Sequence, residues 1–346
     1  MKAIIFEQFG EADVLQVADV PQPEMRPDDL IVRVHAAGVN RADLTHRRGG
    51  YGRPNFGDST IMGLEIAGEV LEVGDAVRGF TIGDRVMGVV GGGAYAEIAR
   101  LDWRMALPIP AALDYVRAAA IPEVFVTAHE AMLHLGRLKT GDSVLIHAAA
   151  GGVGSAAVQL ARATGATVYA MAEASKLEQV KRLGADCVID YRTQDFSQIV
   201  AEQTSRRGVD VVIDFIGAPN FARNISSLAN GGRLVQVGIL GGGGQVSVAL
   251  EDILYRHLQI VGTVMKSRPQ AEKHAMVQRF REHWLDRFSN VTKYGRQIAS
   301  LGELIAADFD LFGGMGKLRI LGVIESEKSR ADRSAGNGQS AESRAH

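Results

Sequence analysis

The chain has 346 residues, a formal net charge of −2 and a single cysteine. Its length allows two domains, each large enough to bury a core. A pI of about 6.5 and scattered basic residues argue against nucleic-acid binding. The lone cysteine, Cys187, excludes an intrachain disulfide and a multi-cysteine zinc site. It is compatible with the cytoplasmic location that we expect.

The first part of the chain is rich in glycine and in short strand patterns. Its opening residues, MKAIIFEQFG, predict a first strand rather than a signal peptide. No apolar run approaches the roughly 20 residues needed to span a bilayer, so we expect no membrane association. Further β-forming segments lie between turn residues at 31–39, 68–74 and 84–90. Residues 1–118 are thus predicted to form a compact, strand-rich domain.

From about residue 119 apolar strands alternate with helices. Strand patterns occupy residues 143–147, 167–171, 187–190, 210–215, 233–238 and 258–263. Helical patterns between them include residues 153–163 and 176–183. Strands that are apolar throughout and separated by helices predict a parallel sheet covered on both faces. The fold class predicted for residues 119–266 is therefore α/β, a doubly wound six-stranded Rossmann dinucleotide-binding domain.

Beyond residue 266 the pattern becomes helical and charged, and it ends in a strand-like segment, KLRILGVI, at residues 317–324. This piece is too short for a domain of its own. We expect residues 267–324 to return to the strand-rich domain and complete it. Residues 325–346 are polar and contain no apolar anchor, so we predict a disordered tail.

The most informative segment is SVLIHAAAGGVGSAAVQLARATGA, at residues 143–166. An apolar strand leads through a turn of small residues into an amphipathic helix. The turn matches Gly-x-Gly-x-x-Gly, with Ala149 permitting the tight turn, Gly151 admitting a pyrophosphate and Gly154 packing the helix on the strand. The helix start supplies N–H groups and a positive dipole end. The cofactor-binding residues predicted here are Ala149, Gly151, Gly152, Val153 and Gly154.

A second glycine-rich segment, GILGGGG at residues 238–244, follows the fifth predicted strand. It would lie at the same edge of the sheet, where Gly238 and Ile239 are candidate contacts for the nicotinamide half of the cofactor. A flexible loop without a binding role is the alternative interpretation.

The choice between NADP and NAD depends on the ends of the second and third strands. An acidic side chain at the end of the second strand is typical of NAD binding, but Met171 lies there. Ser175 and Lys176, with Tyr191 and Arg192 after the third strand, instead suit a 2′-phosphate. A solvated Lys176 is the alternative. Glu173 lies on the same connection and could repel the phosphate or bind a ribose hydroxyl, so the pattern favours NADPH without deciding it.

Five segments together resemble the zinc-free quinone oxidoreductase branch of the medium-chain dehydrogenase/reductase superfamily, the branch that includes zeta-crystallin. They are AAGVNRADLTHRRGGY, IMGLEIAGEVLEVG, GDRVMGVVGGGAYAE, AAIPEVFVTAHEAM and the phosphate-loop segment. NRADL, RRGGY and AAIPE are most similar to the tumour-suppressor-induced NADPH quinone oxidoreductases. The resemblance implies that the strand-rich domain, 1–118 with 267–324, is a GroES-like substrate domain.

Zinc alcohol dehydrogenases of this superfamily have a cysteine near residues 40–43 and a histidine within Gly-His-Glu. Here the corresponding segments are NRAD and Gly63-Leu64-Glu65, and the four-cysteine structural lobe is absent. We therefore expect no metal. Without a Lewis acid, direct hydride delivery to an electron-poor acceptor is favoured over alcohol oxidation.

By resemblance, Asn40 and Thr127 would approach the nicotinamide, and Tyr51 would lie in the substrate cleft. Tyr51 could donate a hydrogen bond to a developing oxyanion or simply line the cleft, and Asn40 could instead be a turn residue. Arg268 and Lys317 are weaker candidates for cofactor or oxyanion contact, with a surface role as the alternative.

The function predicted is NADPH-dependent reduction of quinones by direct hydride transfer without zinc. Its enzyme alternative is reduction of α,β-unsaturated carbonyls, either 2-alkenals or enoyl thioesters. An alternative of another class is a non-enzymatic NADPH-binding redox sensor or structural protein. The resemblance also implies a homodimer, commonly formed by edge-to-edge pairing of the dinucleotide-domain sheets, and residues 234–239 and 258–264 are candidate edge segments.

Overall fold

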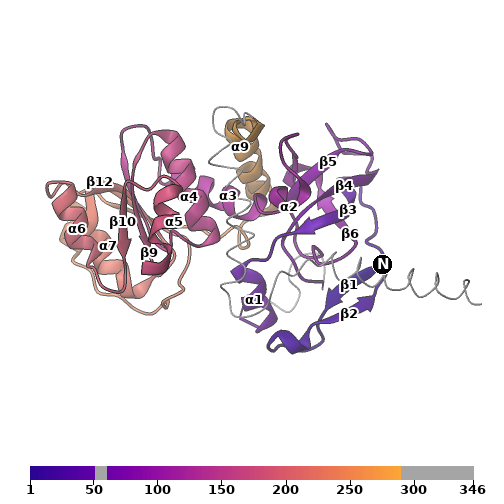
Figure 1. Ribbon diagram of the computed structural model, residues 1–346, viewed down its shortest axis with the longest axis horizontal. Helices are drawn as coiled ribbons and strands as arrows, with labels where there is room; N and C mark the ends of the chain where they lie inside the picture. Colours follow the sequence, from indigo (N-terminus) through magenta and orange to yellow (C-terminus); the bar gives the residue numbers. More distant parts are fainter. Residues whose placement is uncertain (51–60, 290–346) are drawn as a thin grey trace, which may run out of the picture. The chain divides into compact units, whose positions relative to one another are not determined.

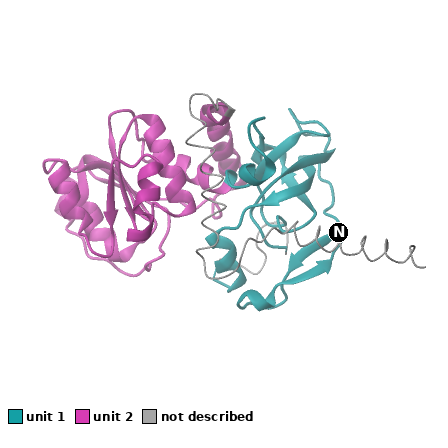
Figure 2. Cartoon of the chain, viewed as in Figure 1, with its two compact units in different colours: residues 1–122, 299–346 teal, residues 123–298 magenta. Residues whose placement is uncertain are grey.

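The computed structural model describes residues 1–50 and 61–289, which fall into two compact units (Figure 2). The described part of unit 1 comprises residues 1–50 and 61–122, and that of unit 2 runs from residue 123 to residue 289. Within the described residues, no helix is both long and apolar enough to cross a bilayer. The domain limits expected from the sequence stay a prediction, because most of the returning segment and the tail lie outside the described residues.

Unit 1 is built on an antiparallel sheet of five strands. Their order is β6 (Ile98–Asp102), β3 (Asp29–Ala37), β4 (Glu65–Val73), β5 (Arg85–Val89) and β7 (Ala106–Pro108). β3 contributes the buried residues 30–32, and β4, β5 and β6 contribute Ile66, Val86 and Leu101, each of these three at most 1% exposed. This core explains why short strand patterns separated by glycines give a single sheet.

Smaller elements complete unit 1. β1 (Lys2–Ile5) and β2 (Gln16–Asp19) form a separate antiparallel pair. The helices are η1 (Ala12–Val14), α1 (Arg41–Arg47), η2 (Trp103–Met105) and α2 (Tyr115–Ala118). α3 (Pro122–His129) begins where unit 1 ends, and it continues into a π-helical turn, η3 (Glu130–Leu135).

Unit 2 contains the predicted six-stranded parallel sheet (Figure 1). Its order is β10 (Cys187–Asp190), β9 (Thr167–Ala172), β8 (Ser143–Ile146), β11 (Val209–Asp214), β12 (Leu228–Gln236) and β13 (Gln259–Gly262). Every neighbouring pair is parallel. The chain starts in the middle, winds outward to β10, and then crosses back to build the other half. This doubly wound order confirms the fold class predicted from the sequence.

The helices of unit 2 lie on both faces of the sheet. α4 (Gly152–Thr164) and α5 (Leu177–Arg182) cover one face, and α6 (Phe196–Gln203) and α7 (Phe221–Ser227) cover the other (Figure 1). The remaining helices are η4 (Ala174–Lys176), η5 (Ala218–Asn220), α8 (Leu250–Tyr255) and α9 (Gln270–Ser289). Leu145, Ile189 and Leu234 are fully buried between the layers, which is why these strands are apolar throughout.

One prediction about this sheet is wrong in part. Residues 234–236 were expected to be edge material, but β12 is paired on both sides, with β11 and with β13. β12 also begins at Leu228, five residues before the predicted start, because Asn230, Gly231 and Gly232 are accommodated within the strand instead of ending it. Among the described strands, the edge on this side of the sheet is β13.

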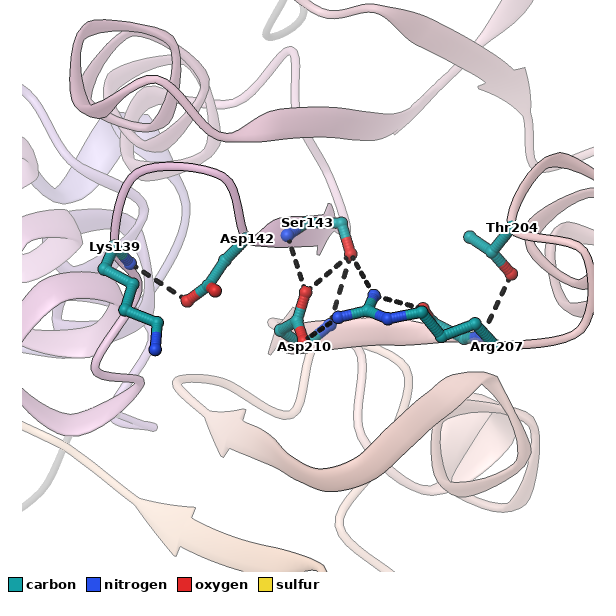
Figure 3. A network of polar contacts seen from close by, with 7 residues as sticks. Lys139, Asp142, Ser143, Thr204, Arg207 and Asp210 are labelled. Carbon is teal, nitrogen blue, oxygen red and sulfur yellow. Dashed lines mark hydrogen bonds and ion pairs between the residues drawn. The ribbon is translucent and has the colours of Figure 1, made fainter.

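The amino ends of the two central strands are joined by a polar network (Figure 3). Asp210 of β11 accepts hydrogen bonds from the Ser143 backbone N–H (2.8 Å) and hydroxyl (2.9 Å) of β8. Arg207 forms an ion pair with Asp210. The N–H of the next residue, Gly208, donates to the Thr204 hydroxyl (2.9 Å). Burial tends to raise the pKa of Asp210, but the bonds from Arg207 and Ser143 outweigh it and hold the pKa below its ordinary value.

Candidate functional site

The sheet order of unit 2 defines where a ligand would bind. β8 and β11 are adjacent, yet the chain leaves them in opposite directions across the sheet. In open parallel sheets the crevice at such a switch point, beyond the carboxyl ends of the strands, is the usual ligand site. The predicted cofactor segments follow β8, β9, β10 and β12, so all of them lie at this one edge.

The turn from β8 into α4 is tight and closely packed. Ala148 adopts a left-handed backbone conformation (φ 45°), and the Ala149 N–H donates to Met171 O (2.8 Å), joining the ends of β8 and β9. α4 then begins after Gly151, its N-cap. A Cβ on Gly154 would lie 2.2 Å from Ala148 O, so only glycine allows the helix to approach the turn this closely. The first N–H groups of α4 are therefore presented at the switch point.

The second and third strands of the Rossmann sheet, β9 and β10, end side by side. Asp190 of β10 is in register with Ala172 of β9, which places the segments after them together. Arg192 Nη2 lies 3.7 Å from Glu173 Oε1, and Arg192 also forms a side-chain hydrogen bond with half-exposed Tyr191. Lys176 ends η4 and is half-buried, and Ser175 beside it is exposed. The negative charge of Glu173 is thus paired with Arg192.

The segment after β12 is tied to the segment after β11. The Leu240 N–H donates to Phe215 O (2.9 Å), the Gly241 N–H to Ile216 O (2.8 Å), and the Ala218 N–H to Gly242 O (3.0 Å). Residues 238–242 therefore form a loop whose backbone is hydrogen-bonded to the segment after β11. Ile239 and Leu240 on this loop remain exposed, by 60% and 56%. Their binding role stays a prediction.

Four buried polar residues at the switch point were not singled out from the sequence. They are His147, directly after β8, Asp214, which ends β11, and Asn220 and Asn224 from the following helical segment. A polar residue at the end of an apolar strand, as in VLIH and VVID, is the signal that identifies the first two. The asparagines carry no comparable signal, because asparagine is common in helix starts and turns.

In unit 1, Asn40 is held at both its backbone and its side chain. Its N–H donates to Asp43 Oδ2 (2.8 Å), and its Nδ2 donates to Glu65 Oε1 (2.7 Å). Burial raises the pKa of the Asp43 carboxyl to about 6, although the Asn40 N–H and the Tyr95 hydroxyl both bond to it. Burial, together with the nearby Asp43, also raises the pKa of Tyr95. This arrangement fixes the orientation of Asn40, whose role toward a cofactor stays a prediction.

The remaining candidates from the sequence are Thr127, Arg268, Tyr51 and Lys317. Thr127 lies on α3 in unit 2 and is half-buried. Arg268 is engaged elsewhere, with Glu130 Oε1 (3.6 Å) and Glu272 Oε2 (2.8 Å). Tyr51 and Lys317 lie outside the described residues. The structure therefore leaves Tyr51 and Lys317 as expectations from the sequence.

The residues at the former zinc positions do not fit a zinc ion. Leu64 has no ligand atom, Asn40 donates its amide hydrogen to Glu65, and the only cysteine, Cys187, lies in unit 2. Over residues 1–50 and 61–289, no group of three or more His, Cys, Asp and Glu side chains is arranged to hold a metal.

Comparisons with known proteins agree with this architecture. Residues 26–111 match the family model of the alcohol dehydrogenase GroES-like domain, and residues 152–282 match that of the zinc-binding dehydrogenases. The quinone oxidoreductase of Rattus norvegicus is 34% identical over 278 residues, which cover 79% of this chain and 82% of the relative.

Two solved structures have the same fold. The quinone oxidoreductase of Escherichia coli, complexed with NADPH, has a TM-score of 0.72 and 26% identity, covering 88% of this chain and 97% of the other. The CurK enoyl reductase is similar in fold, with a TM-score of 0.73 and 24% identity over 89% of this chain and 96% of its own.

A GroES-like sheet and a doubly wound dinucleotide fold in one chain define a medium-chain dehydrogenase/reductase, and the protein is an oxidoreductase. Within that superfamily the chain belongs to the quinone oxidoreductase family, in its zeta-crystallin-like branch.

Proposed function

We propose that this chain reduces quinones with NADPH, by direct hydride transfer and without zinc. The observation that carries the proposal is the switch point of unit 2, where the first turn of α4 meets the carboxyl ends of β8 and β11. The relationship to quinone oxidoreductases, one of them solved with NADPH, supports the same reaction class. A cytoplasmic location belongs to the proposal, in keeping with the single cysteine.

The preference for NADPH is supported by the charges after β9 and β10. Glu173 would repel a 2′-phosphate if its charge were unopposed, but Arg192 lies 3.7 Å away. Lys176 follows β9 and Tyr191 follows β10, at the same edge of the sheet. Both are proposed to donate hydrogen bonds to the 2′-phosphate, together with Ser175. A 2′-phosphate would then meet a net positive surface.

In the reaction, NADPH supplies a hydride, and the quinone takes up that hydride and one proton to give a hydroquinone and NADP⁺. The residues of this chain would bind the pyrophosphate at Gly151–Gly154, orient the nicotinamide and limit the access of water. Asn40, Thr127 and Tyr51 are proposed to approach the nicotinamide or the acceptor. The donor set at Asn40 and Leu64 does not fit a zinc ion, so no step is assigned to a metal.

The test is a comparison of acceptors at fixed NADPH, using 1,4-benzoquinone, 1,4-naphthoquinone, a 2-alkenal and crotonyl-CoA. The proposal predicts the largest kcat/KM with a quinone. A larger value with crotonyl-CoA or the alkenal would instead support the alternative function, reduction of α,β-unsaturated carbonyls. The CurK enoyl reductase shares this fold, so the fold is compatible with that alternative. Tight NADPH binding without turnover on any acceptor would instead indicate a redox sensor or structural protein.

The NADPH preference has its own test in the substitution Glu173→Gln. Removing this carboxylate is expected to tighten NADPH binding several-fold and to leave NADH binding nearly unchanged, because only NADPH carries the 2′-phosphate. Glu202→Gln, an equal charge change on exposed α6, serves as the matched control. Fluorescence titration measures both dissociation constants. Equal effects of the two substitutions would remove Glu173 from the 2′-phosphate site.

A homodimer is proposed on the edge strand β13. Among the described residues, β13 pairs with β12 alone, so its outer edge has N–H and C=O groups available for a second copy. Ile260 on this strand is 42% exposed, and the preceding α8 exposes Leu254 and Tyr255 by 65% and 75%. Sedimentation should show a dimer that Ile260→Lys weakens. A concentration-independent monomer for the unaltered protein would refute the proposal.

A further inference from the structure

Five side chains at the switch point form one continuous run of hydrogen bonds. The contacts are Arg223 Nη2 to Asn220 Oδ1 (2.7 Å), Asn220 Nδ2 to His147 Nδ1 (3.2 Å), His147 Nε2 to Asn224 Oδ1 (2.7 Å), and Asn224 Nδ2 to Asp214 Oδ2 (3.0 Å). His147, Asn224 and Asp214 are at most 1% exposed, so water does not compete for these bonds.

The two ends of the run fix its direction. A guanidinium can only donate, so Asn220 presents its oxygen to Arg223 and its amide nitrogen to His147. Asp214 accepts from Asn224, so Asn224 presents its oxygen to His147. His147 must therefore carry its proton on Nε2 and accept at Nδ1, which is the neutral form of the ring. A protonated ring would direct Nδ1–H at an amide that also donates.

The acceptor end of the run organises the turn after β11. Asp214 Oδ1 accepts from the N–H groups of Ile216 (2.6 Å) and Gly217 (3.3 Å), while Oδ2 receives Asn224. Gly217 has φ +90°, and a Cβ there would lie 2.5 Å from Gly242 O. The turn is thus set by one carboxylate and packs backbone to backbone on the loop 238–242.

That loop depends on the turn for its position. Its backbone bonds run to Phe215 and Ile216, the two residues directly after Asp214, and the Val237 N–H donates to Asp214 O itself (2.8 Å). A displacement of the Asp214 turn would therefore move the exposed Ile239 and Leu240. These two side chains lie at the edge of the sheet where the nicotinamide half of the cofactor is proposed.

We infer that Asp214 is a positioning residue, held by the directed run from Arg223, which sets the loop 238–242 against the nicotinamide half of the cofactor. The inference rests on the proposed function for the identity of the cofactor. Asp214 is fully buried, and its carboxylate reaches the loop only through the backbone of the turn, whereas its own carbonyl accepts directly from the Val237 and Gly238 N–H groups. It therefore acts through residues 215–217, not on the reacting atoms.

The test pairs two identical substitutions on β11, Asp214→Asn at the carboxyl end and Asp210→Asn at the amino end. In Asp214→Asn the new N–H₂ group meets a donor in either orientation, the N–H₂ group of Asn224 or the N–H groups of Ile216 and Gly217. We expect kcat with NADPH and a quinone to fall about 10- to 100-fold, the loss typical of a misplacement of about 1 Å. Asp210→Asn should keep kcat within about twofold.

A second ligand separates positioning from general damage. Adenosine 2′,5′-bisphosphate carries the adenosine half and the 2′-phosphate but no nicotinamide, so Asp214→Asn should bind it as the unaltered protein does. Parallel losses of kcat and of this affinity would overturn the inference, and so would equal kcat values for the two aspartate variants. Failure of the unaltered protein to bind either ligand would refute the proposed function instead.

The directed run itself can be tested without a cofactor. Nitrogen NMR of the unaltered protein at neutral pH should show His147 protonated on Nε2 alone. Protonation on Nδ1 would overturn the run, whatever the activity of the variants, and this measurement stands even if Asp214→Asn does not fold. As a conservative variant, His147→Gln keeps an N–H donor toward Asn224 and should retain more kcat than His147→Leu.

Discussion

The two ends of the strand pair β8 and β11 carry polar networks of different kinds. At the amino ends, Asp210 is joined to Ser143 and to the exposed side chain of Arg207 (Figure 3). At the carboxyl ends, His147 and Asp214 belong to a buried run of amides and an imidazole. The first network joins the two strands by the hydrogen bonds from Ser143 to Asp210 and pairs Asp210 with a guanidinium that is exposed to water. The second fixes the direction of each bond, and with it a loop.

These two strands show that the role of a polar network depends on which end of the parallel strands it occupies. Amino ends face away from the switch point, so a network there has only the sheet to stabilise. Carboxyl ends face the crevice, so a network there also determines the geometry presented to a ligand. Substitutions at matched places on the two strands separate these effects.

The largest expected difference is in the free energy of unfolding. His147→Leu leaves the amides of Asn220 and Asn224 buried without the imidazole partner, at a cost of about 1–3 kcal/mol for each. Ser143→Ala removes a hydroxyl that bonds Asp210 beside an ion pair that remains, at a cost of about 1 kcal/mol. Urea unfolding of both variants measures the difference. Equal losses would mean that the carboxyl-end network contributes no more to the free energy of unfolding than the amino-end network does.

The two networks should affect the free energy of unfolding in different pH ranges. Burial lowers the pKa of His147 below 6.5, against the opposing effects of Asp214 and Asn224, with Arg223 adding to the lowering. Below about pH 6.5 the His147 side chain is protonated in the unfolded chain but stays neutral in the folded one. The free energy of unfolding therefore decreases as the pH falls below about 6.5. The slope from one such group is at most about 1.4 kcal/mol per pH unit.

Asp210 should act in a more acidic range. Its folded pKa is lowered below 3.8, so the stability it contributes is present above that value and is lost as the pH falls through the folded pKa. Unfolding measured between pH 3 and pH 8 should show a smaller slope below about pH 6.5 in His147→Gln than in the unaltered protein, and an unchanged one in Asp210→Asn. Other groups contribute to the slope in both variants, because burial also lowers the pKa of His129 to about 4, which adds to it, and raises that of Asp43 to about 6, which opposes it. A slope above pH 5 that both variants keep would come from other groups.

The smallest expected effect is on salt dependence. Arg207 is 56% exposed at its side chain, so 1 M salt should screen its pair with Asp210 and reduce the cost of Asp210→Asn by a few tenths of a kcal/mol. The cost of His147→Leu should not change, because those bonds are buried. Repeating the urea series at high salt makes the comparison. Salt sensitivity of the His147 variant would indicate that water reaches the carboxyl-end run.

Much of the fold could be read from the order of residues. Six apolar segments separated by helices predicted the parallel sheet, and the small residues from Ala149 to Gly154 predicted a tight strand-to-helix turn, because these are local requirements of backbone and burial. The start of β12 was missed because Gly231 and Gly232 are turn residues in most contexts.

The sequence by itself determined the class of fold, since the strand and helix patterns depend on residue types at short spacing. On the same kind of local pattern it predicted the phosphate loop and the absence of zinc ligands, and both stay predictions. Only the tertiary structure decided that Glu173 is paired, that the loop 238–242 is fixed, and that His147 is bonded through Asn220 and Asn224. The reason is physical. Hydrogen bonds between side chains 73 and 77 positions apart depend on strand order and helix packing, and no local pattern encodes either.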